Sequence, residues 1–433
     1  MRTACLMIIG ATTAIASAQP APDQPPSPAT DPFAMPAPTE PPSSPETTPT
    51  PAPAPAPVAP PATKSKAINA TYNKGVLLQT EDEGFELRLN LRTQVRFEST
   101  RPTEDGAQFS SRFLIPRTRL QAEGYAWGNT NRYKLEFSLG ETGSFAYIKD
   151  LFVEKKLAES TWLRVGQWKR PFNRQELVSD FASEFNERAN TAAFVGGGRD
   201  IGIAVHNDYE KSPEGLEWVV GVFNGFNGGA DRPSLTTTCS QNPMTGALAC
   251  VNPTPTTVPS DFGPAAVARV GWNFGHIKGY SEGDLEGGAP RFAVGLSYKV
   301  DFANFAKGKE SSVTDNMSHG VEADAMIKAH GWGLLLGAYA MKSKSADAQF
   351  GMLVQPGYFV MPKQAQIAGR FAYIPVGARK QIEARAAFNW YWEGHAWKWA
   401  NDIGFLQLTG TDPTTMTTDK PDFQLRTMLQ LTF

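Results

Sequence analysis

Three arginines spaced four residues apart are the residues of this sequence whose chemistry is easiest to interpret. Arg88, Arg92 and Arg96 share one segment, in which every intervening position of opposite parity is apolar or small. A guanidinium is always charged, and its planar fork of donors matches the paired oxygens of carboxylate and phosphate. In an extended strand, residues four apart lie on one face, about 13 Å from each other. The spacing predicts a ladder of positive charge that could guide small anions.

The segment around this ladder has a hydrophobic period of two, which is typical of a β-strand. Phe85, Leu87, Leu89 and Leu91 occupy the face opposite the arginines. Soluble sandwiches also alternate in this way, but here alternating segments of about ten residues recur up to residue 433, which is the signature of a transmembrane β-barrel. We therefore predict an all-β fold, a transmembrane antiparallel barrel of about sixteen strands. The expected strands span residues 85–97, 113–127, 131–140, 146–157, 161–169, 199–206, 216–224, 265–274, 291–303, 320–329, 333–341, 351–360, 365–374, 381–392, 395–408 and 423–433.

The predicted connections alternate between short and long, as they do in outer-membrane barrels. Residues 128–129 and 393–394 form short turns, whereas 170–198 and 225–264 are long loops. The turns near 207–215 and 275–290 are longer than this pattern requires. Trp390, Tyr391, Trp392, Trp397 and Trp399 flank one turn, and those that face outward would join an aromatic girdle, whereas others would pack in the lumen.

The same strand phase turns further basic residues toward the interior. An arginine facing lipid at the middle of the bilayer would cost about 2–4 kcal/mol, which favours the inward orientation. Rings of such residues select anions. A second interpretation is that the arginines pair with Glu86, Glu98, Glu123 or Glu383 across strands and simply hold the wall together. The predicted pore-lining and anion-binding residues are Arg88, Arg92, Arg96, Arg117, Arg119, Arg164, Arg269, Arg291, Lys299, Arg370, Arg385 and Arg426.

The N-terminal residues predict export from the cytoplasm. Residues 1–18 combine Arg2, a short apolar run and an Ala-Ser-Ala cleavage site, which together describe a secretory signal peptide cleaved near Ala18. Residues 19–69 are dominated by Pro and Ala and predict a disordered, semi-rigid periplasmic linker. Residues 70–433 would form the barrel domain in the outer membrane of a Gram-negative bacterium.

The sequence gives little support for nucleic-acid binding, metal binding or catalysis. A net charge of −2 does not point to nucleic acid. The five histidines are scattered without metal-ligand spacing, so we expect no metal, no cofactor and no enzyme activity. Cys239 and Cys250 lie close together in an exported Pro/Thr-rich stretch, which predicts one local disulfide.

Several motifs resemble a known family. The run GQWKRPFNRQ at residues 166–175 is similar to a signature of the phosphate-selective porin O and P family, and FNER at 185–188 and RDIG at 199–202 continue the match. FNG at 223–225, QPGYF at 355–359 and LQLTF at 429–433 also fit in the correct order. The resemblance covers roughly residues 80–433.

The resemblance implies a homotrimer of sixteen-stranded, anion-selective barrels. It also implies that loop 170–198 folds into the channel and constricts it. Candidate residues at that constriction are Lys169, Arg170, Arg174, Arg188 and Arg199, with Glu184 and Glu187 as acidic neighbours. The loop lacks the dense lysine cluster that strong phosphate selectivity would require.

These observations favour a porin for the passive diffusion of small anions, with phosphate or polyphosphate among the candidates. The alternatives are a general porin of low selectivity and a surface adhesin or receptor barrel that binds through loop 225–264. Outer-membrane lipid and small anions are the expected partners.

Overall fold

A computed structural model describes most of the chain. The described residues are 67–101, 108–139, 146–195, 198–225, 238–241, 248–251, 264–302, 317–343, 346–376, 379–410 and 421–433. The predicted signal peptide at 1–18 and the predicted linker up to residue 66 lie outside them. The residues from Thr63 to Phe433 form one compact unit.

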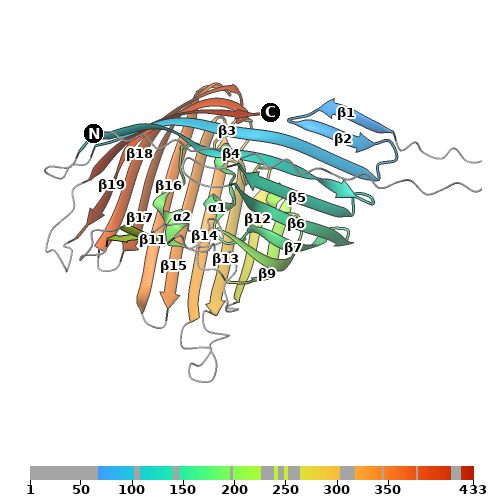
Figure 1. Ribbon diagram of the computed structural model, residues 1–433, viewed down its shortest axis with the longest axis horizontal. Helices are drawn as coiled ribbons and strands as arrows, with labels where there is room; N and C mark the ends of the chain where they lie inside the picture. The colour runs from blue at the N-terminus through green and yellow to red at the C-terminus, as the bar shows by residue number, and fades with distance from the viewer. Residues whose placement is uncertain are drawn as a thin grey trace, which may run out of the picture. The chain divides into compact units, whose positions relative to one another are not determined.

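Sixteen antiparallel strands form a closed ring (Figure 1). Each strand pairs with its neighbour in the sequence, and β20 returns to pair with β3, where Met428 lies opposite Arg96. The ring consists of β3 (Phe85–Arg101), β4 (Ser110–Ala126), β5 (Asn131–Ser138), β6 (Tyr147–Ala158), β7 (Thr161–Lys169), β8 (Arg199–His206), β9 (Gly215–Phe223), β12 (Ala265–Phe274), β13 (Arg291–Phe302), β14 (Met317–Ala329), β15 (Trp332–Ser343), β16 (Ala346–Met361), β17 (Ala365–Val376), β18 (Arg379–Glu393), β19 (Trp397–Thr409) and β20 (Asp422–Thr432). The predicted barrel of about sixteen strands is confirmed.

Two short strands that the sequence did not predict extend the wall at β3. β1 (Ile68–Tyr72) and β2 (Val76–Thr80) form a hairpin, and β2 pairs with the beginning of β3, Val76 opposite Leu89. β1 begins at Ile68, one residue before the predicted end of the linker at residue 69. Five-residue strands are too short for a convincing hydrophobic period, which explains why this hairpin was missed.

The outer face of the ring is apolar, as a lipid-facing surface must be. On β3 the Val95 side chain is 47% exposed, whereas its neighbours Gln94 and Arg96 are buried inside the barrel. Trp392, Trp397 and Trp399 are exposed, which fits the predicted girdle, but Tyr391 is buried. None of the helices in the described residues is long and apolar enough to cross a membrane.

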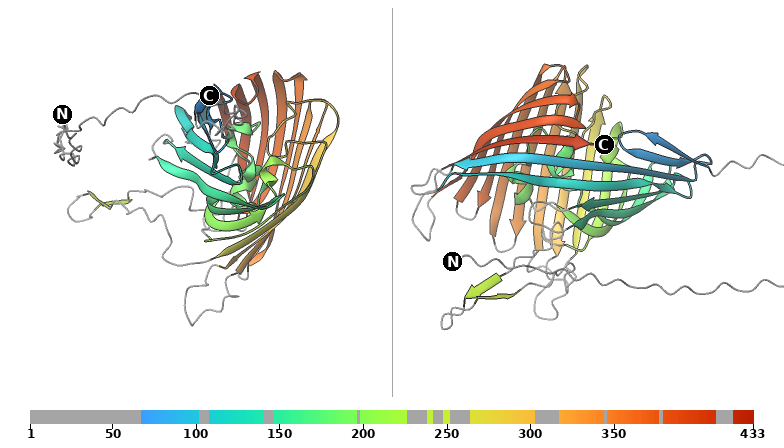
Figure 2. Two further views of the ribbon diagram at one scale, coloured as in Figure 1. Left: turned by 90° about the vertical axis from the view of Figure 1, so that its right-hand side faces the viewer. Right: turned by 45° about the horizontal axis from the view of Figure 1, so that its top comes forward.

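Helical segments lie inside the ring rather than around it (Figure 2). The connection between β7 and β8 carries α1 (Arg174–Leu177), a 3-10 turn (Asp180–Ala182) and α2 (Asn190–Phe194). A second 3-10 turn, Tyr209–Lys211, connects β8 to β9. Because the first connection is loop 170–198, the segment that the resemblance expected to enter the channel does fold inward.

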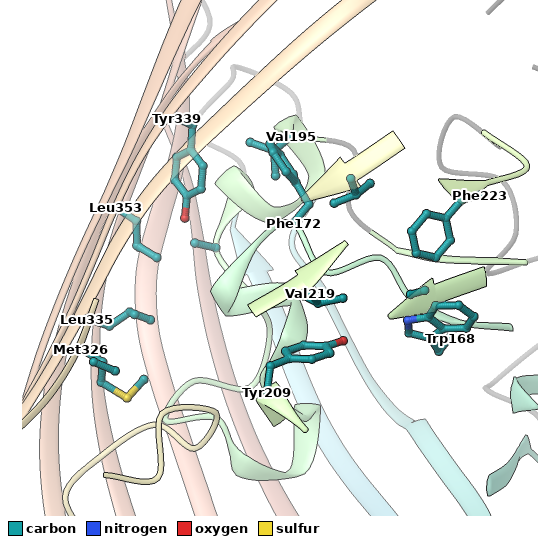
Figure 3. Close-up of a cluster of buried hydrophobic side chains, with 14 of the residues drawn as sticks. Trp168, Phe172, Val195, Tyr209, Val219, Phe223, Met326, Leu335, Tyr339 and Leu353 are labelled. Carbon is teal, nitrogen blue, oxygen red and sulfur yellow. The ribbon is translucent and has the colours of Figure 1, made fainter. Parts of the chain in front are cut away.

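Part of the lumen is a dry hydrophobic core (Figure 3). Phe172 and Val195 of loop 170–198 pack against apolar side chains that point inward from the wall. These wall residues are Val219, Val267, Ala293, Met326, Leu335, Tyr339, Leu353 and Ala372, on strands from β9 to β17. This half of the wall therefore departs from the simple rule of polar inside and apolar outside.

Glycines on the inner face make room for the inserted loop. A Cβ added at Gly320 would lie 2.9 Å from the Phe172 ring, and one at Gly351 would lie 3.2 Å from the Phe194 ring. Such distances leave no space for a side chain. The loop and this wall are therefore complementary in shape, with glycine where the loop comes closest.

Candidate pore and its constriction

All twelve predicted pore-lining cations are on the inner face of the ring. Eight are buried, namely Arg96, Arg117, Arg119, Arg164, Arg269, Lys299, Arg370 and Arg385, and Arg88, Arg92, Arg291 and Arg426 are partly exposed to the lumen. The alternation of the strands produces this placement, since one face of each strand must meet lipid.

Most of these cations are paired with carboxylates. Arg164 donates to Glu154 at 2.8 Å, and Arg269 donates to Asp324 at 2.6 Å. Arg385 bridges to Asp402 on the neighbouring strand at 3.0 Å. The second interpretation of the arginines, as members of cross-strand pairs, therefore describes much of the ladder. Paired charges largely cancel in the lumen and contribute little net field to a passing ion.

The five predicted constriction residues lie in the inserted loop or directly beside it in the sequence. Arg174 is fully buried and pairs with Asp324 on β14, and Arg188 pairs with Asp180 within the loop at 2.7 Å. Arg170 lies 3.5 Å from Asp301, and Arg199 donates to Asp150 at 2.6 Å. Arg170 and Arg174 therefore hold the loop against the wall, whereas Arg188 pairs within the loop and Arg199 on β8 pairs with Asp150 on β6 within the wall.

Lys169 differs from the other four. Its Nζ donates to the backbone carbonyls of Glu176 and Val178, at 2.6 and 3.0 Å. Among the described residues, no carboxylate lies within ion-pair distance of this amine. Backbone carbonyls of the loop, rather than a carboxylate, therefore hold this amine beside the lumen.

Acidic residues of the loop are held in their charged form. Burial raises the pKa of Glu187, but Arg117 and Arg96 outweigh it and hold that pKa at about 2. Burial likewise opposes ionisation of Asp180, but Arg188 and Arg117 hold its pKa well below the usual range. Glu187 accepts from Arg96 on β3 and Arg117 on β4, so it ties the loop to two strands.

A second segment enters the lumen from the end of the barrel that carries the short turns. Residues 275–290 connect β12 to β13, and Ile277 is buried in the same core as Phe172. Lys328 on β14 donates to the carbonyl of Ser281 at 2.7 Å. The sequence indicated only that this turn was longer than expected. Because it folds inward, it meets loop 170–198, where the Glu282 backbone donates to the Ala182 carbonyl at 2.9 Å.

Among the described residues, the wall from β3 to β8 borders open space. Two cavities of about 290 and 300 Å³ adjoin there, and both are lined by Lys134, Phe152 and Glu210. The first cavity is surrounded by the basic residues Arg92, Arg119, Lys134, Lys169 and Arg199 and by the acidic residues Glu136, Asp150, Asp180 and Glu210. Basic and acidic groups therefore nearly balance in this cavity, with five of one kind and four of the other.

Two residues that line these cavities were not among the predicted sites. Lys134 lies 3.1 Å from Asp150, and Arg132 lies 2.8 Å from Asp208. The signal was present in the sequence, because both residues alternate with Tyr133 and Leu135 and so take the inner face of β5. The prediction nevertheless included neither residue.

The described residues contain no cluster of three His, Cys, Asp or Glu side chains that could hold a metal ion. The predicted disulfide lies on a separate hairpin, β10 (Thr238–Gln241) and β11 (Leu248–Val251), whose register sets Cys239 opposite Cys250. Opposed antiparallel residues have Cα atoms about 4.5–5.5 Å apart, a separation that a disulfide can span.

Comparisons with known proteins agree with this architecture. Residues 85–245 match the family described as phosphate-selective porin O and P. No protein of curated function matches the chain. Among solved structures, an anion-selective porin from Comamonas acidovorans has a TM-score of 0.52 at 10% identity, covering 80% of this chain and 99% of that one. The outer-membrane channel DcaP of Acinetobacter baumannii has a TM-score of 0.50 at 13% identity, covering 82% of this chain and 99% of that one.

At these identities the structural likeness establishes the fold. Together with the family match, it indicates a channel and not an enzyme. The chain thus has the fold of an outer-membrane porin, and its predicted resemblance to the phosphate-selective porin O and P family is confirmed over residues 85–245.

Proposed function

We propose that this porin lets small anions, inorganic phosphate among them, diffuse passively along the wall from β3 to β8, with weak selectivity. The observation that carries the proposal is the positive charge of Arg92, Arg119 and Arg199 around one cavity, to which the Lys169 amine adds a donor without a carboxylate partner among the described residues. Low-dielectric walls focus the field of such a charge and raise the local concentration of counter-ions. The extensive pairing of the arginines argues against tight binding of any one anion.

The first experiment is the reversal potential of the full chain in a planar bilayer under a KCl gradient. We expect chloride selectivity, and a weaker selectivity for Lys169→Ala. Lys155→Ala is the matched control, because Lys155 is also a lysine but lies on the outside of the barrel wall, away from the two cavities. Cation selectivity of the wild-type channel, or equal losses in both variants, would contradict the proposal.

Phosphate is tested by titrating it into the chloride current. Weak, millimolar block that is relieved by Lys169→Ala supports phosphate as one permeating anion. Block at micromolar phosphate would indicate a specific phosphate site, and no block would leave a general porin. A closed barrel without conductance would instead favour the adhesin or receptor alternative.

The resemblance also supports proposals about assembly and export. We expect a homotrimer in native detergent extracts, which cross-linking would detect as three linked chains. N-terminal sequencing of the mature protein should begin at Gln19, following cleavage after Ala18. The Pro/Ala-rich segment 19–69 would then remain as a periplasmic tether.

A further inference from the structure

Two inward-folded segments enter the barrel from opposite ends and meet at a pair of carboxyl groups. Glu184 belongs to loop 170–198, and Glu282 belongs to segment 275–290. The backbone of Glu282 donates to the Ala182 carbonyl at 2.9 Å, and the backbone of Glu184 donates to Glu282 Oε2 at 2.8 Å. Each glutamate is only 2% exposed.

Neutral amides, rather than cations, contact the two carboxyl groups directly. Gln355 Nε2 on β16 donates to Glu184 at 2.8 Å and to Glu282 at 3.0 Å. Gln366 on β17 donates to the other oxygen of Glu184. Glu282 Oε1 is buried and finds no hydrogen-bond partner among the described residues. A buried carboxylate oxygen without a donor is costly, so this site compensates negative charge poorly.

The surrounding cations are engaged elsewhere. Lys328 on β14 and Lys398 on β19 donate to the carbonyls of Ser281 and Ser183, at 2.7 and 2.6 Å. Arg370 on β17 donates to Gln355 and pairs with Glu383. The remaining titratable groups around the pair are His395, which approaches Ser281, Tyr391 on β18, and Asp284 and Glu286 of the same segment. These cations attract the pair from a distance but do not neutralise it by contact.

We propose that Glu184 and Glu282 form a pH-sensitive latch that holds the two segments together while the pair carries a proton and releases them when both carboxyls ionise. Two buried carboxylates in one site repel each other, so full ionisation must weaken the contact. Release would widen the lumen on the side of β13 to β19, beside the existing path. This inference rests on the proposed function, since it concerns the conductance of the same channel.

The direction of the pH effect follows from Glu184. Burial, together with the charge of Glu282, raises the pKa of Glu184 to about 7. A carboxyl whose pKa is raised favours the packed state below its ordinary value of 4.5, and this stabilisation is lost as pH rises through about 7. The latch is therefore closed in acid and open in mild alkali.

The test is single-channel conductance of the full-length porin between about pH 5 and about pH 9. The wild-type conductance should rise with a midpoint near 7. Glu282→Gln should shift the midpoint downward by at least about one pH unit, because it removes the repelling charge. Glu184→Gln should abolish the step. Glu159→Gln, on the exposed turn between β6 and β7, is the control and should leave the midpoint unchanged.

The outcomes separate the latch from the porin function itself. A conducting channel with the same conductance across this range would overturn the latch while leaving anion passage intact. An unchanged midpoint in Glu282→Gln, or the same shift in Glu159→Gln, would also overturn it. Absence of current at every pH would contradict both proposals. If one of the two glutamine variants fails to fold into a barrel, the other can still test the latch. Heat-dependent migration in gel electrophoresis would show whether each variant is folded.

Discussion

Glu184 and Glu187 are three residues apart on one loop, yet their carboxyl groups face opposite kinds of partner. Glu184 meets a second acid and neutral amides, whereas Glu187 accepts from the guanidinium groups of Arg96 and Arg117. One acid is therefore easily protonated and the other is held ionised. The loop carries two pH responses of opposite sign, one near neutrality and one in strong acid.

Acid should weaken the attachment of the loop through Glu187. Its pKa of about 2 lies below the ordinary value of 4.5, so its stabilising effect is complete above 4.5 and is lost as pH falls toward 2. Thermal unfolding of the detergent-solubilised barrel should show a falling midpoint across this window. Glu187→Gln should be less stable at pH 7 and should have a flatter profile in acid, whereas parallel profiles would contradict the assignment.

Replacing Arg174 should destabilise the barrel strongly. Arg174→Ala leaves Asp324 with one cation fewer in a fully buried network, and breaking a buried pair costs about 3 kcal/mol. The free energy of unfolding in urea would measure the loss. Lys211→Ala removes an exposed pair with Asp208 and should cost under about 1 kcal/mol. Similar losses in the two variants would show that the buried network does not support the loop.

Adding a methyl group at Gly357 should push the loop away from the wall. Its Cβ would collide with the Glu184 carboxyl, and overpacking of this kind costs about 1–3 kcal/mol. Gly369→Ala on the adjacent strand is the control, since its nearest neighbour is Pro356 at 3.8 Å. Urea unfolding and channel noise should change for Gly357→Ala alone, and a neutral Gly357→Ala would argue against the tight fit.

Removing one acid from the cavity should increase anion selectivity. Glu136 pairs with Arg92 and lies 3.7 Å from Arg119 and 3.5 Å from Arg199. Glu136→Gln leaves these three guanidinium groups less compensated, so the reversal potential under a KCl gradient should move toward that of chloride. Glu393→Gln, at an exposed strand end, should not move it. A shift toward potassium would exclude this cavity from the ion path.

The hairpin of β10 and β11 should be covalently closed. Mass spectrometry of non-reduced peptides should recover Cys239 joined to Cys250, which the paired register favours. Reduction should leave single-channel conductance unchanged, because neither cysteine belongs to the barrel strands. Two free thiols in the exported protein would refute the predicted bridge.

The strands were predictable because lipid imposes a strict period of two. On β18, for example, Phe388 is exposed outside, and Glu383 and Arg385 are buried inside. Any register slip of one residue would expose those charges to the bilayer. The location of each cation followed from the same constraint, which is why all twelve reached the inner face.

The side chains and segments that fill the lumen were less predictable. The outer face always meets lipid, whereas the inner face meets either water or an inserted segment of the protein. Leu335 and Leu353 point inward where a polar side chain was expected, since the inserted loop covers them. For segment 275–290, which also folds inward, the only signal in the sequence was that it is longer than a typical turn. The pairing of Arg385 with Asp402 depends on which strands become neighbours and in which register. The alternation of residues within one strand does not carry this information.

The hairpin of β1 and β2 bears on how the ring closes. Leu91 on β3 exchanges two backbone hydrogen bonds with Phe433, at 2.7 and 2.9 Å, and β2 takes up the same edge of β3 from Leu89 onward. The strand preceding Phe433 therefore cannot advance along β3 without displacing β2. The hairpin therefore acts as a stop that fixes the register of the seam between β20 and β3.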